Sequence, residues 1–199
     1  MKRVPNLLSW LRMILAPIFI VLYLHDQILW SALSLFVFVL AAITDYFDGY
    51  IARHYGAKSE FGVFLDPLAD KVLTFSGFIG LSIYYPQFFP WIGIILIMGR
   101  DIFITLLRVH AKKHGKVMVT SNSAKAKTFT QMTFLIIALF AGVIARTSLT
   151  AAGDFSYWLL DTGILTWFYY VVVLFTVYTA FEYILTNRHL FGSEKQTAA

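Results

Sequence analysis

Long apolar segments, separated by short polar ones, occupy almost the whole of this chain. They cover about residues 7–24, 30–53, 66–85, 90–111, 125–146 and 164–186. Each is close to the ~20 residues that an α-helix needs to cross the hydrocarbon core of a bilayer. Only 14% of the 199 residues are charged and 59% are hydrophobic, which is outside the balance of soluble domains. The pattern predicts an all-α integral membrane protein with six transmembrane helices.

These segments leave no room for a second domain. We expect one membrane domain over residues 1–190, followed by a disordered tail at 191–199. The first residues, MKRVPNLLSWLR, mix basic side chains with leucines and a tryptophan, which is typical of a short segment at the membrane interface. The chain has no cysteine, so its sequence carries neither a disulfide framework nor a thiolate metal site.

The basic residues fall almost entirely on one side of the predicted membrane. Of the 16 Lys and Arg, only Arg146 belongs to the connections at 25–27, 85–90 and 146–163. Cytoplasmic loops of membrane proteins carry an excess of Lys and Arg. Six crossings place both termini on the same side of the membrane. Because the basic residues lie on that side, we expect both termini to lie in the cytoplasm.

Four aspartates stand in the segment DYFDGYIARHYGAKSEFGVFLDPLAD, residues 45–70. Asp45 and Asp48 are three residues apart near the end of the predicted second helix, so their carboxylates share one face. Asp66 and Asp70 are four residues apart at the predicted start of the third helix and also share a face. Two helix ends can thus direct four carboxylates at one point.

Such a cluster needs compensation, because four carboxylates at the bilayer centre cost about 10 kcal/mol in total. Arg53 and Lys71 are candidate partners, but two cations cannot balance four acids. Clustered oxygen ligands suit hard divalent ions such as Mg²⁺ or Mn²⁺, which add water and substrate phosphate to their shell. The cluster therefore predicts two metal ions and a phosphate-bearing substrate. Asp66 has helix capping as an alternative role, since Pro67 after it suits a first helical turn.

The spacing of this region is D-x2-D-G-x2-A-R-x8-G-x3-D-x3-D, read here as Asp45, Asp48, Gly49, Ala52, Arg53, Gly62, Asp66 and Asp70. All eight fixed positions match the signature of the CDP-alcohol phosphatidyltransferases, so the chain resembles that family. The resemblance implies a six-helix membrane fold and a homodimer, with no nucleic-acid partner. It also implies a reaction in which a hydroxyl of an acceptor alcohol attacks the β-phosphorus of a CDP-linked lipid and CMP is released.

The resemblance further assigns roles to the four aspartates. Asp45, Asp48 and Asp66 are expected to bind the two metal ions, while Asp70 binds one of them and takes the hydroxyl proton as general base. Metal ions on a diphosphate stabilise the transferring and leaving oxygens of an in-line displacement. These roles explain why an apolar chain keeps four acids together.

Contacts to CDP-diacylglycerol are expected, by the same resemblance, from the N-terminal segment and the signature region. The residues are Asn6, Ser9, Gly49, Ala52, Arg53, Ser59 and Gly62. Small side chains at Gly49 and Ala52 would let the cytidine and ribose lie against the helix backbone, and Arg53 would meet the diphosphate.

The shared signature does not distinguish the acceptor alcohol, so other residues must. The segment GRDIFITLLRVHAKKHGKVMVTSNSAKAKTFTQ, residues 99–131, places Arg100, Arg108, Lys125 and Lys127 on the side of the aspartates. Arginine binds phosphate in a bidentate fork and lysine adds a point charge. An anionic acceptor is therefore favoured over choline or ethanolamine.

This segment, together with PNLLSWLR at 5–12, resembles the family members that use sn-glycerol 3-phosphate and form phosphatidylglycerophosphate. The likeness rests on G-R-D at 99–101 and K-x-K-T-x-x-Q at 125–131, although Ala124 and Ser9 stand where those members often have Gly and Thr. It implies a site for the acceptor phosphate formed by Arg12, Arg100, Arg108, Lys125 and Lys127. Because a soluble acceptor phosphate is supplied from the cytoplasm, we expect the site to face the cytoplasm in a bacterial inner membrane.

Several alternatives stay open. Inositol phosphate, serine and phosphatidylglycerol are other acceptors, and a cation transporter is the alternative from a different class, since intramembrane carboxylates often mark ion pathways. Basic residues at 108–127 can serve only to attract anionic lipids, at about 1 kcal/mol each. Arg100 can form a structural ion pair with Asp101. His110 and His114 have a spacing that can chelate a metal but favour a solvated basic face.

Overall fold

The computed structural model of the protein describes residues 4–55, 60–114, 118–119, 121–147 and 151–188. Side chains are described for these residues except 4–8, 45–55, 60–68, 70, 112 and 113. The helices are α1 (Val4–Tyr23), α2 (Ile28–Tyr55), α3 (Glu60–Tyr84), α4 (Trp91–Lys113), α5 (Asn122–Ile144), α6 (Ala151–Asp161) and α7 (Ile164–Thr186). No strand occurs in the described part of the chain, so the all-α prediction is confirmed.

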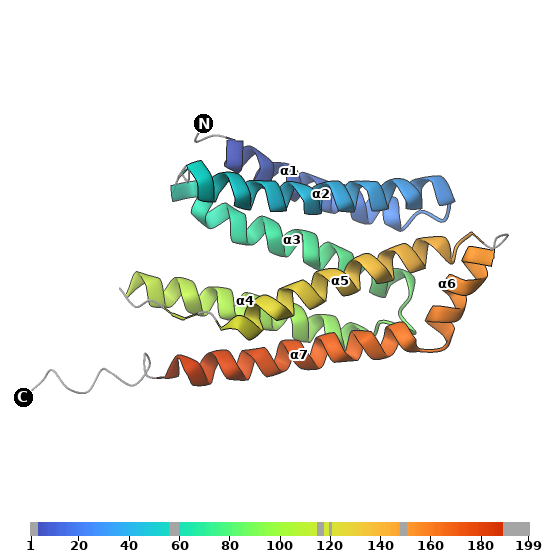
Figure 1. The fold of residues 1–199 in the computed structure, drawn as a ribbon. Helices are drawn as coiled ribbons and strands as arrows, with labels where there is room; N and C mark the ends of the chain where they lie inside the picture. Colours follow the sequence, from blue (N-terminus) through green and yellow to red (C-terminus); the bar gives the residue numbers. More distant parts are fainter. Residues whose placement is uncertain (1–3, 56–59, 115–117, 120, 148–150, 189–199) are drawn as a thin grey trace, which may run out of the picture.

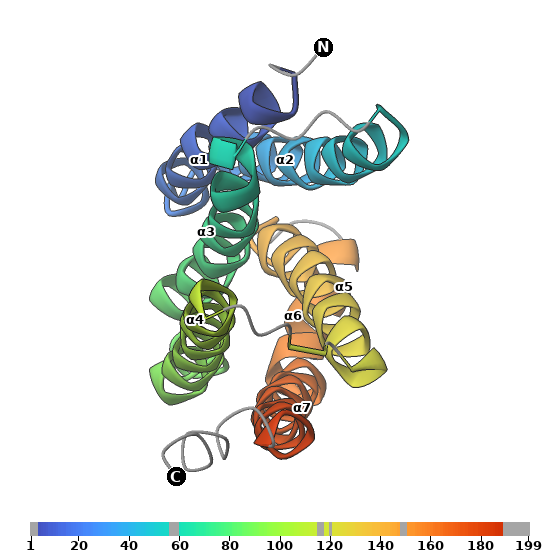
Figure 2. The ribbon, with the colours of Figure 1, turned by 90° about the vertical axis from the view of Figure 1, so that its left-hand side faces the viewer.

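The long helices form two groups that lie side by side. α1 packs against α2 and α3, while α4 and α5 pack against α7. α3 joins the groups through contacts with α4 and α5 (Figures 1 and 2). Successive long helices run in opposite directions, so the described ends of the chain, Val4 and Arg188, lie at one end of the bundle (Figure 1). The end of α2 and the beginning of α3, where the signature lies, are at this same end.

The sequence analysis did not predict α6, which lies within the connection expected at 146–163. Its 11 residues span only about 16 Å, too short to cross a bilayer. The helix lies across the far end of the bundle, between α5 and α7 (Figure 1). It buries Gly153, Ser156 and Leu160, which form one narrow stripe. Gly163 then adopts φ 76°, a conformation that suits glycine, and the chain enters α7.

Two other boundaries differ from the prediction. α3 begins at Glu60 rather than at about residue 66, so Pro67 lies inside the helix and not in its first turn. α1 begins at Val4, so the N-terminal segment expected at the interface continues directly into the first long helix. Apolarity alone defined the predicted ends, and helices extend beyond their apolar part into polar residues. The tail predicted at 191–199 lies outside the described residues.

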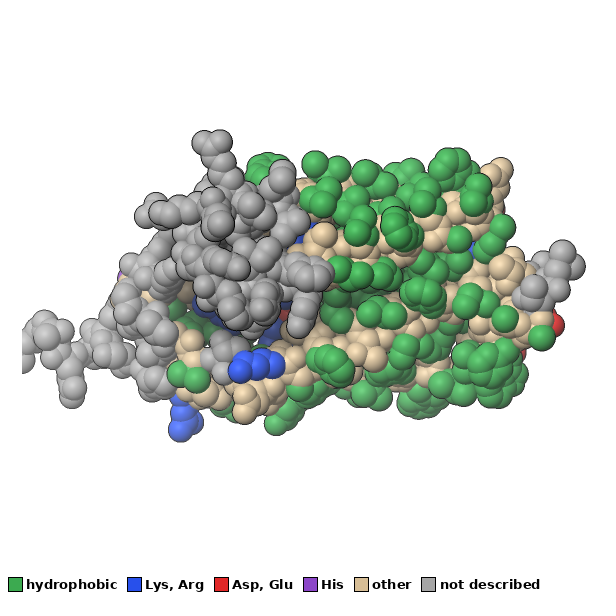
Figure 3. All heavy atoms as spheres, turned by 45° about the horizontal axis from the view of Figure 1, so that its top comes forward, with side chains coloured by type: hydrophobic (Ala, Val, Ile, Leu, Met, Phe, Trp, Pro, Cys, Tyr) green, Lys and Arg blue, Asp and Glu red, His purple; other side chains and the backbone are tan. Residues whose placement is uncertain are grey.

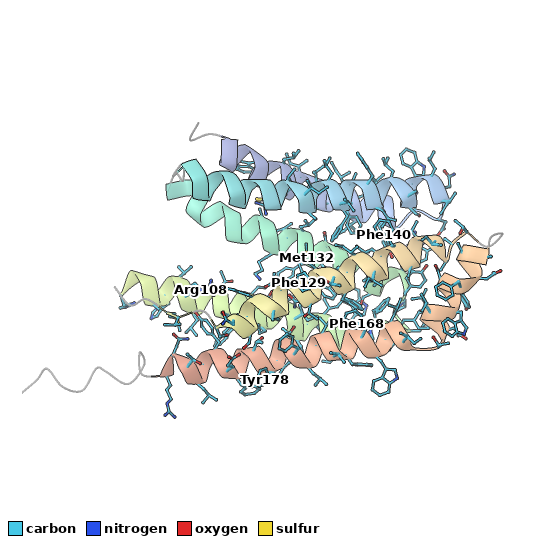
Figure 4. All side chains as sticks on the ribbon, viewed as in Figure 1. Arg108, Phe129, Met132, Phe140, Phe168 and Tyr178 are labelled. Atoms are coloured by element: carbon cyan, nitrogen blue, oxygen red, sulfur yellow. The ribbon has the colours of Figure 1, made fainter. Side chains whose placement is uncertain are left out.

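The helices are those of a membrane protein. In the described part of the chain, α5 and α7 are long and apolar enough to cross a membrane, and shorter apolar stretches cover Ser9–Tyr23, Ile28–Thr44 and Lys71–Tyr84. Hydrophobic side chains cover much of the visible helical face in Figure 3. Figure 4 shows Phe129 on α5 and Tyr178 on α7, and both rings are exposed. Such exposure is costly in water but normal against lipid.

An aromatic cluster unites the two helix groups. The rings of Phe78 on α3, Phe89 before α4, Phe134 on α5 and Tyr169 on α7 are all buried. Phe134 lies 5.9 Å from Phe78, 5.8 Å from Phe89 and 5.9 Å from Tyr169, measured between ring centroids. Rings at this separation gain favourable edge and offset contacts in addition to their burial. The two groups therefore share one core.

Arg146, two residues after the end of α5, contacts the ends of α1, α2 and α3 at the far end of the bundle. Its guanidinium donates from Nη1 to the carbonyl oxygen of Tyr23 and to Oγ of Ser31, both at 2.7 Å. The hydroxyl of Tyr85 donates to the carbonyl oxygen of Gly142 at 2.5 Å. A Cβ at Gly142 would lie 2.8 Å from the Tyr23 hydroxyl, so glycine allows this close approach.

Candidate active site

The signature residues lie on two continuous helices at the end of the bundle that holds Val4 and Arg188. α2 runs unbroken through Asp45 and Asp48, and α3 runs unbroken through Asp66 and Asp70. Uninterrupted helix keeps each pair of aspartates on one face, as the spacing predicted. The side chains lie outside the described residues for Asn6, Asp45, Asp48, Gly49, Ala52, Arg53, Ser59, Gly62, Asp66 and Asp70.

A buried carboxylate on α4 holds three cations near this region. Oδ2 of Asp101 accepts a hydrogen bond from Nζ of Lys71 on α3 at 2.7 Å. Oδ1 accepts from Nζ of Lys127 on α5 at 2.7 Å and from Nη1 of Arg100 at 3.0 Å. The side chains of Asp101 and Lys127 are each 1% exposed, that of Arg100 is 9% exposed and that of Lys71 is 22% exposed. These four residues, called the Asp101 cluster below, carry a surplus of two positive charges.

Arg100 has a further donor to satisfy. Its Nη2 donates to the carbonyl oxygen of Thr179 on α7 at 3.4 Å, which brings a fourth helix to the cluster. Its Nε is buried and has no hydrogen-bond partner in the part of the chain that the structure describes. A buried donor without an acceptor costs about 1–3 kcal/mol, and more when it is charged. The donor and the surplus charge both favour the binding of an anion.

Polar contacts between α5 and α7 continue from the Asp101 cluster along the bundle. Nε2 of Gln131 donates to Oγ1 of Thr176 at 3.1 Å, and Oγ of Ser123 donates to Oε1 of Glu182 at 2.8 Å. Ser123, Lys127 and Gln131 follow one another at intervals of four residues, so they share one face of α5. Lys127 therefore lies in the seam where α5 meets α7. Lys and Arg side chains are visible in a hollow on the face of the molecule shown in Figure 3.

The structure brings together two of the residues predicted to bind the acceptor phosphate. That predicted set is Arg12, Arg100, Arg108, Lys125 and Lys127. Arg100 and Lys127 meet at Asp101. Arg108 is exposed two turns further along α4, with its guanidinium carbon 5.7 Å from the ring centroid of Tyr183 (Figure 4). Lys125 is exposed on α5, and Arg12 is buried on α1.

Two residues of the cluster were not assigned to the site from the sequence. Lys71 was a candidate partner of the signature aspartates, whose side chains lie outside the described residues, and the structure pairs it with Asp101. Asp101 was considered as part of the G-R-D element and as an ion-pair partner of Arg100, a contact that the structure contains. The sequence offered one indication that these two residues belong to the site: Lys71 directly follows Asp70, and Asp101 directly follows Arg100. Sequence spacing within a helix cannot show which helices meet.

Three further residues have clear surroundings. Ser9, predicted to contact the CDP-lipid, is buried on α1. The rings of His110 and His114 lie 4.4 Å apart between centroids, and both residues are exposed on α4. This exposure agrees with the solvated face expected for the two histidines.

An all-helical membrane bundle that carries this aspartate signature beside a cationic cluster has the features of a membrane enzyme acting on phosphorylated substrates. The chain belongs to the CDP-alcohol phosphatidyltransferase family, whose sequence profile matches residues 2–178. The resemblance found in the signature is thereby confirmed over most of the chain.

Curated relatives carry names from one branch of this family. The chain is 33% identical over 197 residues to a probable phosphatidylglycerophosphate synthase of Mycobacterium tuberculosis, covering 98% of this chain and 86% of the relative. It is 31% identical over 188 residues to a CDP-diacylglycerol–glycerol-3-phosphate 3-phosphatidyltransferase of Salmonella typhimurium, covering 93% and 94%. A protein of the same name from Rickettsia typhi is 37% identical over 139 residues, covering 70% and 77%.

Proposed function

We propose that the chain transfers the phosphatidyl group of CDP-diacylglycerol to a hydroxyl of sn-glycerol 3-phosphate, giving phosphatidylglycerophosphate and CMP in phospholipid biosynthesis. The observation that supports a phosphate-bearing acceptor is the surplus of two positive charges in the Asp101 cluster. The second pKa of a phosphate monoester is about 6, so the phosphate group is mostly dianionic at neutral pH. Its charge matches the surplus. The names of the relatives in three bacteria support the same acceptor.

A pair of divalent ions fits the donor set of the signature. Unbroken helix at both pairs of aspartates keeps four carboxylates on two helix faces, and an all-oxygen set suits Mg²⁺ or Mn²⁺. Asp45, Asp48, Asp66 and Asp70 would hold the ions. When bound, the ions would supply positive charge to the diphosphate of the lipid substrate.

The remaining roles fall to side chains of the chain itself. Asp70 takes the proton from the acceptor hydroxyl, a task for which a carboxylate is a weak but sufficient base in phosphoryl transfer. Arg100 and Lys127 hold the acceptor phosphate, and Arg53 meets the diphosphate. Gly49 and Ala52 leave room for the cytidine and ribose beside α2.

The topology follows from the alternating helices. We propose six crossings by α1, α2, α3, α4, α5 and α7, with α6 at the outer surface. Both termini and the active site then lie on the cytoplasmic side of a bacterial inner membrane, and the protein is a homodimer. The shared end of Val4 and Arg188 supports this topology (Figure 1). Arg146, the lone basic residue of the outer connections, lies at the opposite end.

An acceptor panel tests the proposal. Purified protein in mixed micelles is given Mg²⁺, labelled CDP-diacylglycerol and one of four acceptors: sn-glycerol 3-phosphate, inositol phosphate, serine or phosphatidylglycerol. We expect CMP release to be fastest with sn-glycerol 3-phosphate. Faster release with another acceptor would replace the assignment. Cation flux in proteoliposomes without CMP release from any acceptor would favour the transporter alternative.

A further inference from the structure

We propose that Asp101 is a positioning residue for the acceptor phosphate. One oxygen of its carboxylate holds the two cations that bind the phosphate, and the other ties them to α3 through Lys71. This inference rests on the proposed function, because it names how the acceptor site of that reaction is held.

Lys127 and Arg100 meet at one carboxylate oxygen. Both donate to Oδ1 of Asp101, at 2.7 Å and 3.0 Å, so two like charges are held close together in a buried site. Without the negative charge between them they would repel each other, and the low dielectric of the surroundings strengthens that repulsion. Asp101 is 1% exposed, so water cannot readily take its place. The carboxylate therefore fixes the spacing of the two cations.

The second oxygen connects this pair to the helix that carries the proposed general base. Oδ2 accepts from Lys71 at 2.7 Å, and Lys71 directly follows Asp70 on α3. The contact joins α4 and α3 at the depth of the base, while Lys127 joins α5 at the same carboxylate. A phosphate held by Arg100 and Lys127 would thus keep a fixed distance from α3. Placing a reacting hydroxyl within reach of its base is a large part of catalysis in such transfers.

A purely structural ion pair does not account for the cluster. One cation would neutralise Asp101, and buried ion pairs add little stability over apolar residues of similar size. Among the described side chains three cations surround one acid, and Nε of Arg100 has no acceptor there. This excess is expected of a site that completes its charge balance with a substrate.

The test compares two variants in steady-state assays with Mg²⁺. Asp101→Asn keeps the size of the side chain and removes its charge. We expect the KM for sn-glycerol 3-phosphate to rise at least about thirtyfold, the usual minimum for loss of one partner of a buried charge pair, and the KM for CDP-diacylglycerol to change by less than about twofold. The matched control is Thr176→Val, which removes a buried contact between α5 and α7 outside the cluster. Both KM values of this control should stay within about twofold of wild type.

Two results would overturn the inference: an acceptor KM unchanged in Asp101→Asn, or a parallel rise of both KM values, which indicates general loosening. Should Asp101→Asn show no cooperative thermal transition, Asp101→Glu replaces it, because it keeps the charge and displaces the cations by one methylene. We expect Asp101→Glu to raise the acceptor KM alone and by a smaller factor. A parallel rise or no change there also contradicts the proposal.

Failure of the proposed function gives a different result. If wild-type protein prefers another phosphate-bearing acceptor, the assignment of sn-glycerol 3-phosphate fails, and the same KM comparison is made with that acceptor. If wild-type protein uses sn-glycerol 3-phosphate and the variants show no selective change in acceptor KM, the role of Asp101 alone is wrong.

Discussion

The guanidinium carbon of Arg146 lies 3.5 Å from the ring centroid of Tyr84 and 4.5 Å from that of Tyr23. A cation over an aromatic face gains about 0.5–2 kcal/mol, more when it is shielded from water. The same group donates to backbone and hydroxyl oxygens of Tyr23 and Ser31. One side chain therefore fastens the ends of α1, α2, α3 and α5, far from the signature.

Replacing Arg146 by lysine is expected to lower stability without impairing catalysis. Lysine keeps the charge but lacks the planar guanidinium, which stacks on the rings while its Nη1 donates to Tyr23 and Ser31. We expect Arg146→Lys to lose about 1–3 kcal/mol, seen as a lower melting temperature in detergent, with unchanged KM values. A large increase in either KM would show that this end of the bundle communicates with the site.

The aromatic cluster gives a second stability prediction. Phe134 touches rings from three other parts of the chain, and its side chain is buried. Phe134→Ala should cost about 3–5 kcal/mol through lost contacts and a residual cavity. The control is Phe129→Ala on the same helix. Phe129 is 74% exposed, so loss of its ring should change the free energy of unfolding little. Similar melting temperatures for the two variants would contradict the assignment of the core.

The proposed general base is tested by Asp70→Asn. We expect this variant to bind CDP-diacylglycerol, measured by equilibrium binding, while CMP release falls at least about 100-fold, as expected for loss of general base catalysis. Asp161→Asn, an exposed change on α6, is the control and should retain wild-type turnover. Robust turnover by Asp70→Asn would remove the base from the proposal.

Arg108 is predicted to contribute to acceptor binding from the end of α4. Arg108→Ala should raise the KM for sn-glycerol 3-phosphate more than that for the lipid, by roughly three- to tenfold, because an exposed cation is screened by solvent. His110→Ala, an exposed neighbour on the same helix, is the control. Equal effects of the two substitutions would leave Arg108 without a specific role.

Metal dependence follows from the four aspartates. Treatment with EDTA should abolish CMP release, and added Mg²⁺ or Mn²⁺ should restore it. Ca²⁺ at the same concentration serves as the comparison, since it is larger and takes more ligands. Release that persists after exhaustive chelation would show that the aspartates act without metal ions.

Much of the fold could be predicted because apolar length is a direct signal of a membrane helix. The ranges at 125–146 and 164–186 lie within three residues of α5 and α7. α6 was missed because its 11 residues include Asp154, Asp161 and several turn formers, and its buried stripe is too short to stand out. The pattern of apolar residues therefore identified the long helices. It did not identify α6, which is defined by its packing at the end of the bundle.

The site was predictable only in part, for a similar reason. Phosphate chemistry pointed to Arg100 and Lys127, and the structure brings them together. Nothing in the spacing of Lys71, in one helix, indicates a contact with Asp101, in the next, because that contact depends on the rotation of both helices. Contacts between residues of different helices can be identified only once the packing of the helices is known.

The contact between Lys71 and Asp101 also bears on how the chain enters a bilayer during synthesis. α3 and α4 emerge from the ribosome before α5, so the acid on α4 can meet Lys71 before Lys127 has emerged. A hairpin of these two segments can therefore be inserted with its acid already neutralised. The nascent protein need not wait for its later helices before this buried acid has a cationic partner.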